Sequence, residues 1–126
     1  MRRILMPLII SCTLLTSFIP GAGKAASIRL LLAYEAGCNE SARWAQEIGP
    51  LYHDSAEGQT APLLRVNING PWPDGLILDR RPRVSPTFIL LQDGQETGRM
   101  EGYSGKADFW LRTRSLLHNG GIFAGR

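Results

Sequence analysis

Apolar and polar positions along the early part of the chain predict a buried strand followed by a helix. Residues 28–34, IRLLLAY, form an almost unbroken apolar run, which is typical of a central strand covered on both faces. Residues 39–48 fit a helix with one apolar side. Gly49 and Pro50 then predict its end, because glycine caps helices and proline cannot continue them. The polar residues 51–61 are expected to form a loop.

The later pattern predicts three further strands. Residues 63–68, LLRVNI, alternate between apolar and polar side chains, as a half-buried strand does. Residues 87–91, TFILL, form another apolar strand. Asp93 and Gly94 are a tight-turn signal, which leads into a returning strand over residues 96–101.

The remaining stretches predict a crossover and a last helix. Residues 76–83 fit either a short helix or an irregular crossover. Residues 106–118 fit an amphipathic helix, which Asn119, Gly120 and Gly121 end. Its apolar stripe consists of Phe109, Trp110, Thr113, Leu116 and Leu117. The order strand, helix, strand, crossover, strand, hairpin strand, helix predicts a mixed-sheet α/β domain with helices on both faces.

Residues 1–25 have the order of a secretory signal peptide. Two arginines precede the apolar run 4–19, and a cluster of small residues follows it. Cleavage is expected after Ala25 or Ala26, which leaves a domain over residues 26–126.

Two other interpretations of this leader stay open. An uncleaved membrane anchor is disfavoured because the apolar run contains Pro7 and is shorter than the ~20 residues of a membrane span. A lipid anchor on Cys12 requires the apolar region to stop at Ser11, and it continues beyond that residue.

Composition and charge fit one exported domain. The chain has 126 residues, with 14 lysines and arginines against 11 acids, for a net charge of +3. Arg2, Arg3 and Lys24 leave with the leader and no acid does, so the remaining domain is neutral. The basicity therefore belongs to export, and no basic face indicates binding to nucleic acid.

The chain has two cysteines, and only one belongs to the predicted domain. Cys12 is lost with the leader, so Cys38 has no partner for an internal disulfide. A leftover thiol in an oxidising compartment is either buried or reactive.

The position of Cys38 favours reactivity. It follows a strand and Gly37 at the start of a helix, where backbone N–H groups and the helix dipole stabilise a thiolate. The thiol pKa is therefore expected to lie below its ordinary value of about 8.5. Ser85 and Pro86 stand just before another core strand, and X-Pro bonds are where cis peptides occur. A parallel arrangement is expected to bring both loops to the same end of the sheet.

These residues together resemble the thioredoxin superfamily. Its redox-motif position holds AGCNES, its cis-proline position holds SPTF, and its hairpin, Gly-Tyr turn and last helix match DGQETGRMEGYSGKADFW. The resemblance covers nearly all of residues 27–118. Within the superfamily, EAGC, EGQTAPLLRVNI and SPTFILLQDGQETGRMEGY are similar to the exported SoxS-type thioredoxins encoded with sulfur-oxidation genes. The resemblance implies a thioredoxin-like fold, a mixed central sheet flanked by helices, in a periplasmic protein.

The resemblance also implies a thiol–disulfide protein, with three departures, one of which is Gly37 in place of the aromatic residue that often precedes the attacking cysteine. In such proteins a first cysteine, here Cys38, attacks, and a second cysteine resolves the mixed disulfide. Ser41 stands at the second position, which puts ordinary dithiol turnover in doubt. Leu30 and Leu32 occupy the first strand, where many thioredoxins bury an acid.

A Cys-x-x-Ser motif still permits chemistry. Cys38 is expected to be the nucleophile, Ser41 a hydrogen-bond donor to its thiolate, and Ser85, Pro86 and Thr87 the docking site for an extended peptide. Release of a mixed disulfide must come from a second thiol, either glutathione-like or on the client. This predicts monothiol exchange or mixed-disulfide capture, without a cofactor or a metal.

Two alternative functions fit the same residues. One is a redox-inactive thioredoxin-fold interaction module, in which Cys38 is a buried structural residue. The other is a glutathione-dependent monothiol reductase. The expected partners are a client protein thiol or disulfide, with a sulfur-oxidation protein as one candidate, and glutathione. No nucleic acid is expected, and the membrane is expected to be met only through the export signal.

The remaining candidates carry weaker signals. His53 and His118 do not share a ligand spacing, and Cys38 with His53 is too small a set for a closed metal centre. Trp72 either contacts a partner or anchors its loop. Three arginines precede Ser85, namely Arg80, Arg81 and Arg83. They either form a solvated face or flank the Cys38 loop. In the second case they are expected to lower the thiol pKa or to attract an acidic client.

Overall fold

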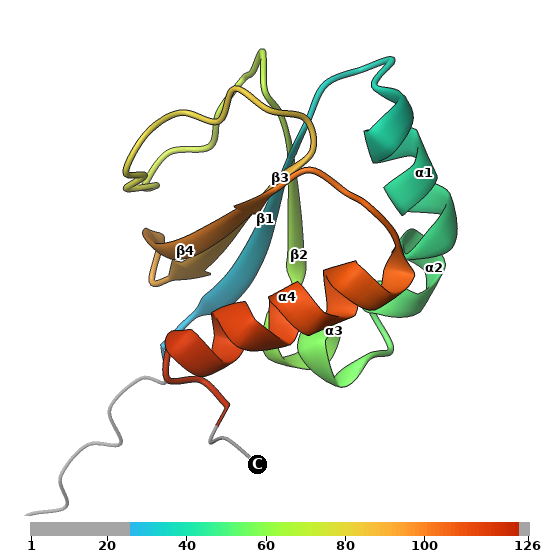
Figure 1. The fold of residues 1–126 in the computed structure, drawn as a ribbon. Helices are drawn as coiled ribbons and strands as arrows, with labels where there is room; N and C mark the ends of the chain where they lie inside the picture. Colours follow the sequence, from blue (N-terminus) through green and yellow to red (C-terminus); the bar gives the residue numbers. More distant parts are fainter. Residues whose placement is uncertain (1–25, 124–126) are drawn as a thin grey trace, which may run out of the picture.

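The computed structural model describes residues 26–123 and arranges them as four strands and four helices (Figure 1). In chain order the elements are β1 (Ile28–Tyr34), α1 (Asn39–Glu47), α2 (Gly49–Tyr52), α3 (Ala56–Thr60), β2 (Leu63–Asn67), β3 (Thr87–Gln92), β4 (Gln95–Glu101) and α4 (Lys106–Asn119). The predicted signal peptide over residues 1–25 and Cys12 lie outside the described residues. None of the helices within 26–123 has the length and apolar character needed to span a membrane.

The sheet is mixed, as predicted, with the strand order β2-β1-β3-β4. β1 and β2 are parallel, whereas β3 is antiparallel to both β1 and β4. Because β1 and β3 are antiparallel, the end of β1 lies beside the start of β3, and Ala33 pairs with Thr87. The loop after β1 and the loop before β3 therefore meet at one end of the sheet. We predict from the sequence that these two loops lie together, but on the assumption of parallel strands. That assumption is wrong, because β1 and β3 are antiparallel.

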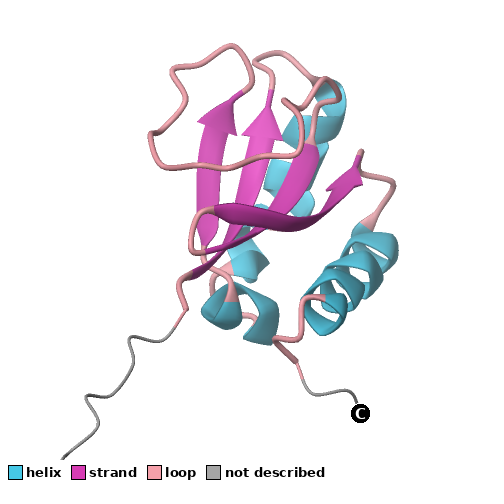
Figure 2. Cartoon of the chain, turned by 90° about the vertical axis from the view of Figure 1, so that its left-hand side faces the viewer, coloured by secondary structure: helices cyan, strands magenta, loops and turns pink. Residues whose placement is uncertain are grey.

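All helices within residues 26–123 pack on one face of the sheet. The core on that face joins Leu30 and Leu32 of β1 with Trp44, Tyr52 and Phe109 from the helical layer. The opposite face is covered by the crossover, residues 68–86, which runs from β2 to β3 without a helix (Figure 2). The prediction of helices on both faces is therefore wrong. The crossover holds four prolines, which disfavour a helix there.

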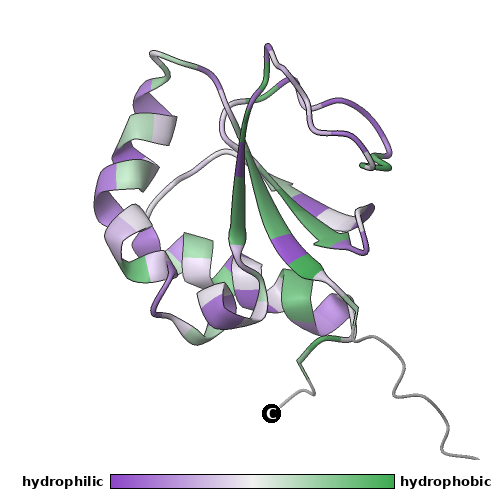
Figure 3. Cartoon of the chain, turned by 180° about the vertical axis from the view of Figure 1, so that it is seen from behind, coloured by the Kyte–Doolittle hydropathy of each residue, from purple (hydrophilic) through white to green (hydrophobic). Residues whose placement is uncertain are grey.

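Aromatic side chains fill the layer between the sheet and the helices. The centre of the Phe109 ring lies 5.1 Å from the ring centre of Phe88, 5.8 Å from that of Trp44 and 6.2 Å from that of Tyr52. All three contacts are edge-to-face. Such pairs stabilise a core beyond simple burial. Figure 3 shows the hydrophobic central strands against helices of mixed hydropathy, which matches helices with a single buried side.

The segment expected to be a polar loop, residues 51–61, is largely helical. Pro50 is the second residue of α2, where the N–H that proline lacks would have no helical partner. Pro50 therefore lies in the first turn of a new helix, directly after the end of α1. Ser55 caps α3, and its Oγ accepts from the backbone N–H of Gly58 at 2.9 Å. Helices this short give no periodic pattern, which explains the wrong prediction. Residues 76–83 are irregular and contain no helix.

Candidate functional site

The Cys38 thiol lies at the start of α1, directly after the turn that leaves β1. Gly37 has a φ of +83°, in the left-handed region that favours glycine, and it directs the chain into the helix. The backbone N–H of Cys38 donates to the carbonyl of Glu35 at 3.2 Å, and Ala42 N–H donates to the Cys38 carbonyl at 3.0 Å. Cys38 is the helix N-cap residue and is partly exposed.

Ser85, in the loop before β3, contacts the Cys38 sulfur. The Cys38 Sγ lies 3.3 Å from the Ser85 carbonyl oxygen, to which the thiol donates. The Ser85 hydroxyl oxygen accepts from the backbone N–H of Glu35 at 2.8 Å and lies 2.9 Å from the Ser41 hydroxyl. The Ser85–Pro86 peptide bond is cis. The structure thus brings Cys38, Ser41 and Ser85 together across 47 residues of sequence.

These contacts favour the ionised sulfur. The hydroxyl of Ser85 and then the backbone N–H of Ser41 hold the pKa of the Cys38 thiol below its ordinary value, and the Ser41 hydroxyl acts in the same direction. Partial burial opposes them and raises the pKa, but by less than the hydrogen bonds lower it. The neutral thiol donates to the Ser85 carbonyl, while the side chains of Ser85 and Ser41 favour the thiolate. At a given pH below the ordinary thiol pKa, a larger share of Cys38 is therefore the nucleophilic thiolate than in an unperturbed thiol.

Pro86 and Thr87, where the crossover enters β3, are both buried. The Pro86 carbonyl accepts from the backbone N–H of Gly102 at 2.7 Å. Thr87 is fully buried, and its hydroxyl donates to the Val84 carbonyl at 2.6 Å. Of the three residues predicted to dock a peptide, Ser85 contacts the sulfur, and the Thr87 side chain stabilises the turn through its hydrogen bond to the Val84 carbonyl.

An open hollow of ≈ 310 Å³ lies beside Cys38. It runs from the Cys38 loop to Arg65 of β2, whose guanidinium lies 5.4 Å from the centre of the Tyr34 ring. Arg65 and Tyr34 are not predicted from the sequence as site residues. Their proximity depends on the register of β1 against β2, in which Tyr34 pairs with Asn67, and no local pattern reveals that register.

The other candidates have partners elsewhere. Arg80 is paired with Glu101 at 3.2 Å, and Arg81 lies 5.3 Å from the centre of the Trp72 ring. The Trp72 indole N–H donates to the Ile68 carbonyl at 3.0 Å and its ring packs on the second face of the sheet, so it anchors the crossover.

The two histidines do not form a ligand cluster. The His53 Nδ1 lies 3.0 Å from an oxygen of Asp54 in an exposed loop, and His118 lies in the last turn of α4. Within residues 26–123, no three His, Cys, Asp or Glu side chains gather as a metal site.

Comparison with solved structures identifies a related periplasmic protein. No protein-family model matches the chain, and no curated protein does. The periplasmic thioredoxin SoxS from Paracoccus pantotrophus, in its reduced form, shares 40% sequence identity with this chain. The alignment covers 74% of this chain and 98% of that protein, with a TM-score of 0.72.

Proposed function

This chain belongs to the SoxS-type family of periplasmic thioredoxins, and from this premise we propose that it exchanges thiols and disulfides with a client protein through the single sulfur of Cys38. The observation that carries the proposal is the placement of that sulfur. Cys38 is partly exposed at the N-terminus of α1, and the side chains of Ser85, from the loop before β3, and Ser41, from α1, lower the pKa of its thiol.

The first step is the attack of the Cys38 thiolate on a client disulfide. A bond forms between the Cys38 sulfur and one client sulfur, the client S–S bond breaks, and the other client sulfur leaves as a thiolate that takes a proton from water. The number of disulfide bonds does not change. Ser85 supports this step by stabilising the attacking thiolate, and the backbone beside Pro86 offers an edge for an extended client segment.

The second step requires a thiol from outside this site. Ser41 occupies the place of a resolving cysteine, and its hydroxyl cannot displace a sulfur. A second thiol, on the client or on a small molecule of the glutathione class, attacks the client sulfur of the mixed disulfide. Cys38 then leaves as the thiolate, and a new disulfide forms between the incoming thiol and the client sulfur.

The proposed location is the periplasm. The related SoxS protein is periplasmic, and the predicted signal peptide over residues 1–25 provides the means of export. An exported sulfur-oxidation protein with a reactive cysteine is the client class we propose, by analogy with that family.

Two measurements test the function. The protein is treated with glutathione disulfide, and the adduct is located by peptide mapping, since Cys12 carries a second thiol in the unprocessed chain. The rate of alkylation of Cys38 is measured as a function of pH. We expect one adduct on Cys38 and an alkylation pKa well below about 8.5. Cys38→Ala is the control and should abolish the adduct.

The alternatives give different results. A Cys38 with an ordinary thiol pKa and no adduct contradicts the proposal and favours a redox-inactive interaction module. Catalytic turnover in an assay coupled to glutathione, with small disulfides as substrates, favours the monothiol reductase instead.

A further inference from the structure

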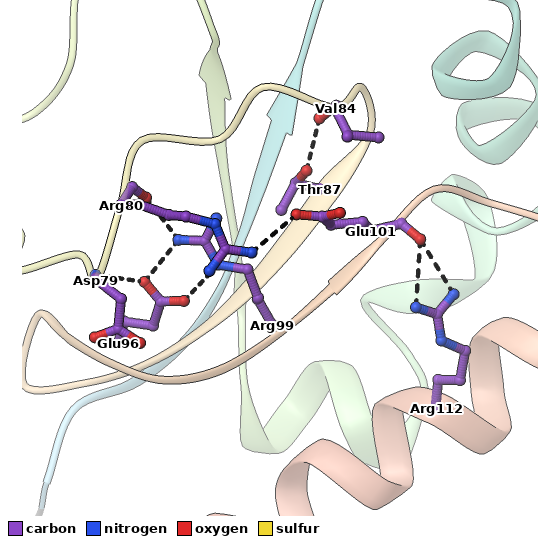
Figure 4. Close-up of polar contacts among 8 residues, drawn as sticks. All are labelled: Asp79, Arg80, Val84, Thr87, Glu96, Arg99, Glu101 and Arg112. Carbon is purple, nitrogen blue, oxygen red and sulfur yellow. Dashed lines mark hydrogen bonds and ion pairs between the residues drawn. The ribbon is translucent and has the colours of Figure 1, made fainter.

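A buried ion pair on the edge strand β4 holds the crossover that leads to Ser85. Arg99 Nε lies 2.5 Å from Glu96 Oε1, and the two side chains are only 9% and 1% exposed. Both also bind the main chain of the crossover. The Asp79 N–H donates to Glu96 Oε2 at 2.8 Å, and Arg99 Nη2 donates to the Arg80 carbonyl at 2.6 Å. Figure 4 shows these contacts, by which the pair holds two successive crossover residues in place.

The contacts continue along the crossover toward Ser85. The Arg80 side chain reaches Glu101 at 3.2 Å, and Glu101 is the partner of Thr87 in the pairing of β3 with β4. Thr87 in turn holds the Val84 carbonyl (Figure 4). The crossover is therefore held at Arg80 and at Val84, with three residues between, one of which is a proline with a restricted φ. Only residues 81–84 separate the Arg80 anchor from Ser85.

Stability alone explains this ion pair poorly. Removing both charges from water costs free energy that their attraction offsets only in part. Arg99 Nη1 is also buried without a hydrogen-bond partner among the described residues, whereas buried donors are normally satisfied. What the pair does provide is a defined geometry, because a planar guanidinium and a carboxylate together hold two backbone groups in register.

We propose that Glu96 and Arg99 are positioning residues that control the reactivity of Cys38 by setting where Ser85 lies. The inference rests on the proposed function, since it concerns the same sulfur. The Ser85 hydroxyl is the foremost of the groups that stabilise the Cys38 thiolate, so its displacement weakens a contact that depends closely on distance and angle.

The test compares Glu96→Gln with a matched control. Glu57→Gln removes the charge of another largely buried carboxylate, which pairs with Arg114 at 2.9 Å in the helical layer. The alkylation rate of Cys38 is measured against pH in both variants and in the wild type. We expect Glu96→Gln to raise the alkylation pKa and to slow alkylation about fivefold at a pH below it. Glu57→Gln should leave the pH profile at its wild-type position.

The outcomes separate this inference from the proposed function. A wild-type Cys38 with an ordinary pKa defeats the proposed function itself. A wild-type pKa that is lowered, and equally lowered in Glu96→Gln, overturns only the positioning role. If Glu96→Gln does not fold, the Arg99→Lys variant is used to test the inference. The lysine side chain keeps the positive charge, but its single ammonium cannot bind Glu96 and the Arg80 carbonyl in the geometry of the guanidinium. Slower alkylation in Arg99→Lys supports the inference, and an unchanged profile overturns it.

Discussion

Replacing Ser85 by alanine removes the hydroxyl that links the three parts of the site. That oxygen accepts from the Glu35 N–H at 2.8 Å, lies 2.9 Å from the Ser41 hydroxyl, and stabilises the Cys38 thiolate. The Ser85 carbonyl, which accepts from the neutral thiol, belongs to the backbone and remains. The substitution therefore destabilises the ionised form and leaves the hydrogen bond of the protonated form unchanged, so the thiol pKa rises.

The magnitude follows from the strength of the hydrogen bond that the substitution removes from the thiolate. A hydrogen bond to a charged group is worth about 1.5–3 kcal/mol. Because Cys38 is partly exposed, solvent screening reduces this to about 1 kcal/mol or slightly more. We therefore expect the pKa to rise by about one unit, with about tenfold less thiolate at a pH below both values. The Ser41 contacts remain and keep the pKa from returning fully to its ordinary value.

The assay is the rate of Cys38 alkylation as a function of pH. Ser104→Ala is the matched control, because the Ser104 hydroxyl makes one exposed hydrogen bond, to Asp108 at 2.9 Å, away from the sulfur. An alkylation pKa that is the same in Ser85→Ala and the wild type refutes the assignment of Ser85 as the leading stabilising group.

Stability against pH gives an independent check of the sign. The folded-state pKa of Cys38 is lowered, so the unfolded chain binds more protons between that pKa and the unfolded value of about 8.5. Stability from this group therefore rises with pH across that interval, and it is lost as the pH falls through the folded pKa. Ser85→Ala should make the rise smaller. An equal rise in both proteins, measured by denaturant unfolding, contradicts the reasoning.

Three further predictions concern the second thiol, the connecting helices and the core. Ser41→Cys supplies the missing resolving sulfur one helical turn from Cys38, so turnover in an insulin-reduction assay should appear in this variant and be absent in the wild type. Gly58→Ala places a methyl carbon 1.7 Å from the Tyr52 carbonyl oxygen and should destabilise the fold by about 2 kcal/mol or more in denaturant unfolding. Gly49→Ala is its control, since the nearest atom there is 4.0 Å away, and equal stability losses in the two would show the clash to be unimportant. Phe109→Ala removes the central ring of the aromatic layer and should lower the free energy of unfolding by about 3–5 kcal/mol, a large share of a typical domain's stability. A loss of about 1 kcal/mol would contradict the packing described.

Strands with strong periodic or apolar patterns are predictable from the sequence to within a residue or two. The strand predicted over residues 28–34 has the same bounds as β1, and the last helix predicted over residues 106–118 ends one residue later. These elements bury one side or both sides along their whole length, so each side chain contributes to the pattern. α2 and α3 are too short for such a pattern, which is why the sequence predicts a loop there.

The candidate site is predictable only in part. A cysteine after a strand at a helix start, and a Ser-Pro pair before another strand, are local signals, and both lie where expected. The role of the Ser85 hydroxyl is not a local signal, because it depends on how the two loops approach each other. The peptide-docking role predicted for the backbone of Ser85, Pro86 and Thr87 stays a prediction, and the Thr87 side chain is buried and donates to the Val84 carbonyl.

Local sequence patterns specify which segments form strands and long helices, and they place one sulfur at a helix start, because burial and capping are encoded by neighbouring residues. The meeting of Ser85 with Cys38 through antiparallel pairing, and the placement of all the described helices on one face, follow from long-range packing. The same holds for the ion pair of Glu96 and Arg99, which holds the crossover in place. The physical reason is that such contacts join residues far apart in the chain, and their geometry depends on strand register and on the path of the crossover, which no local pattern records.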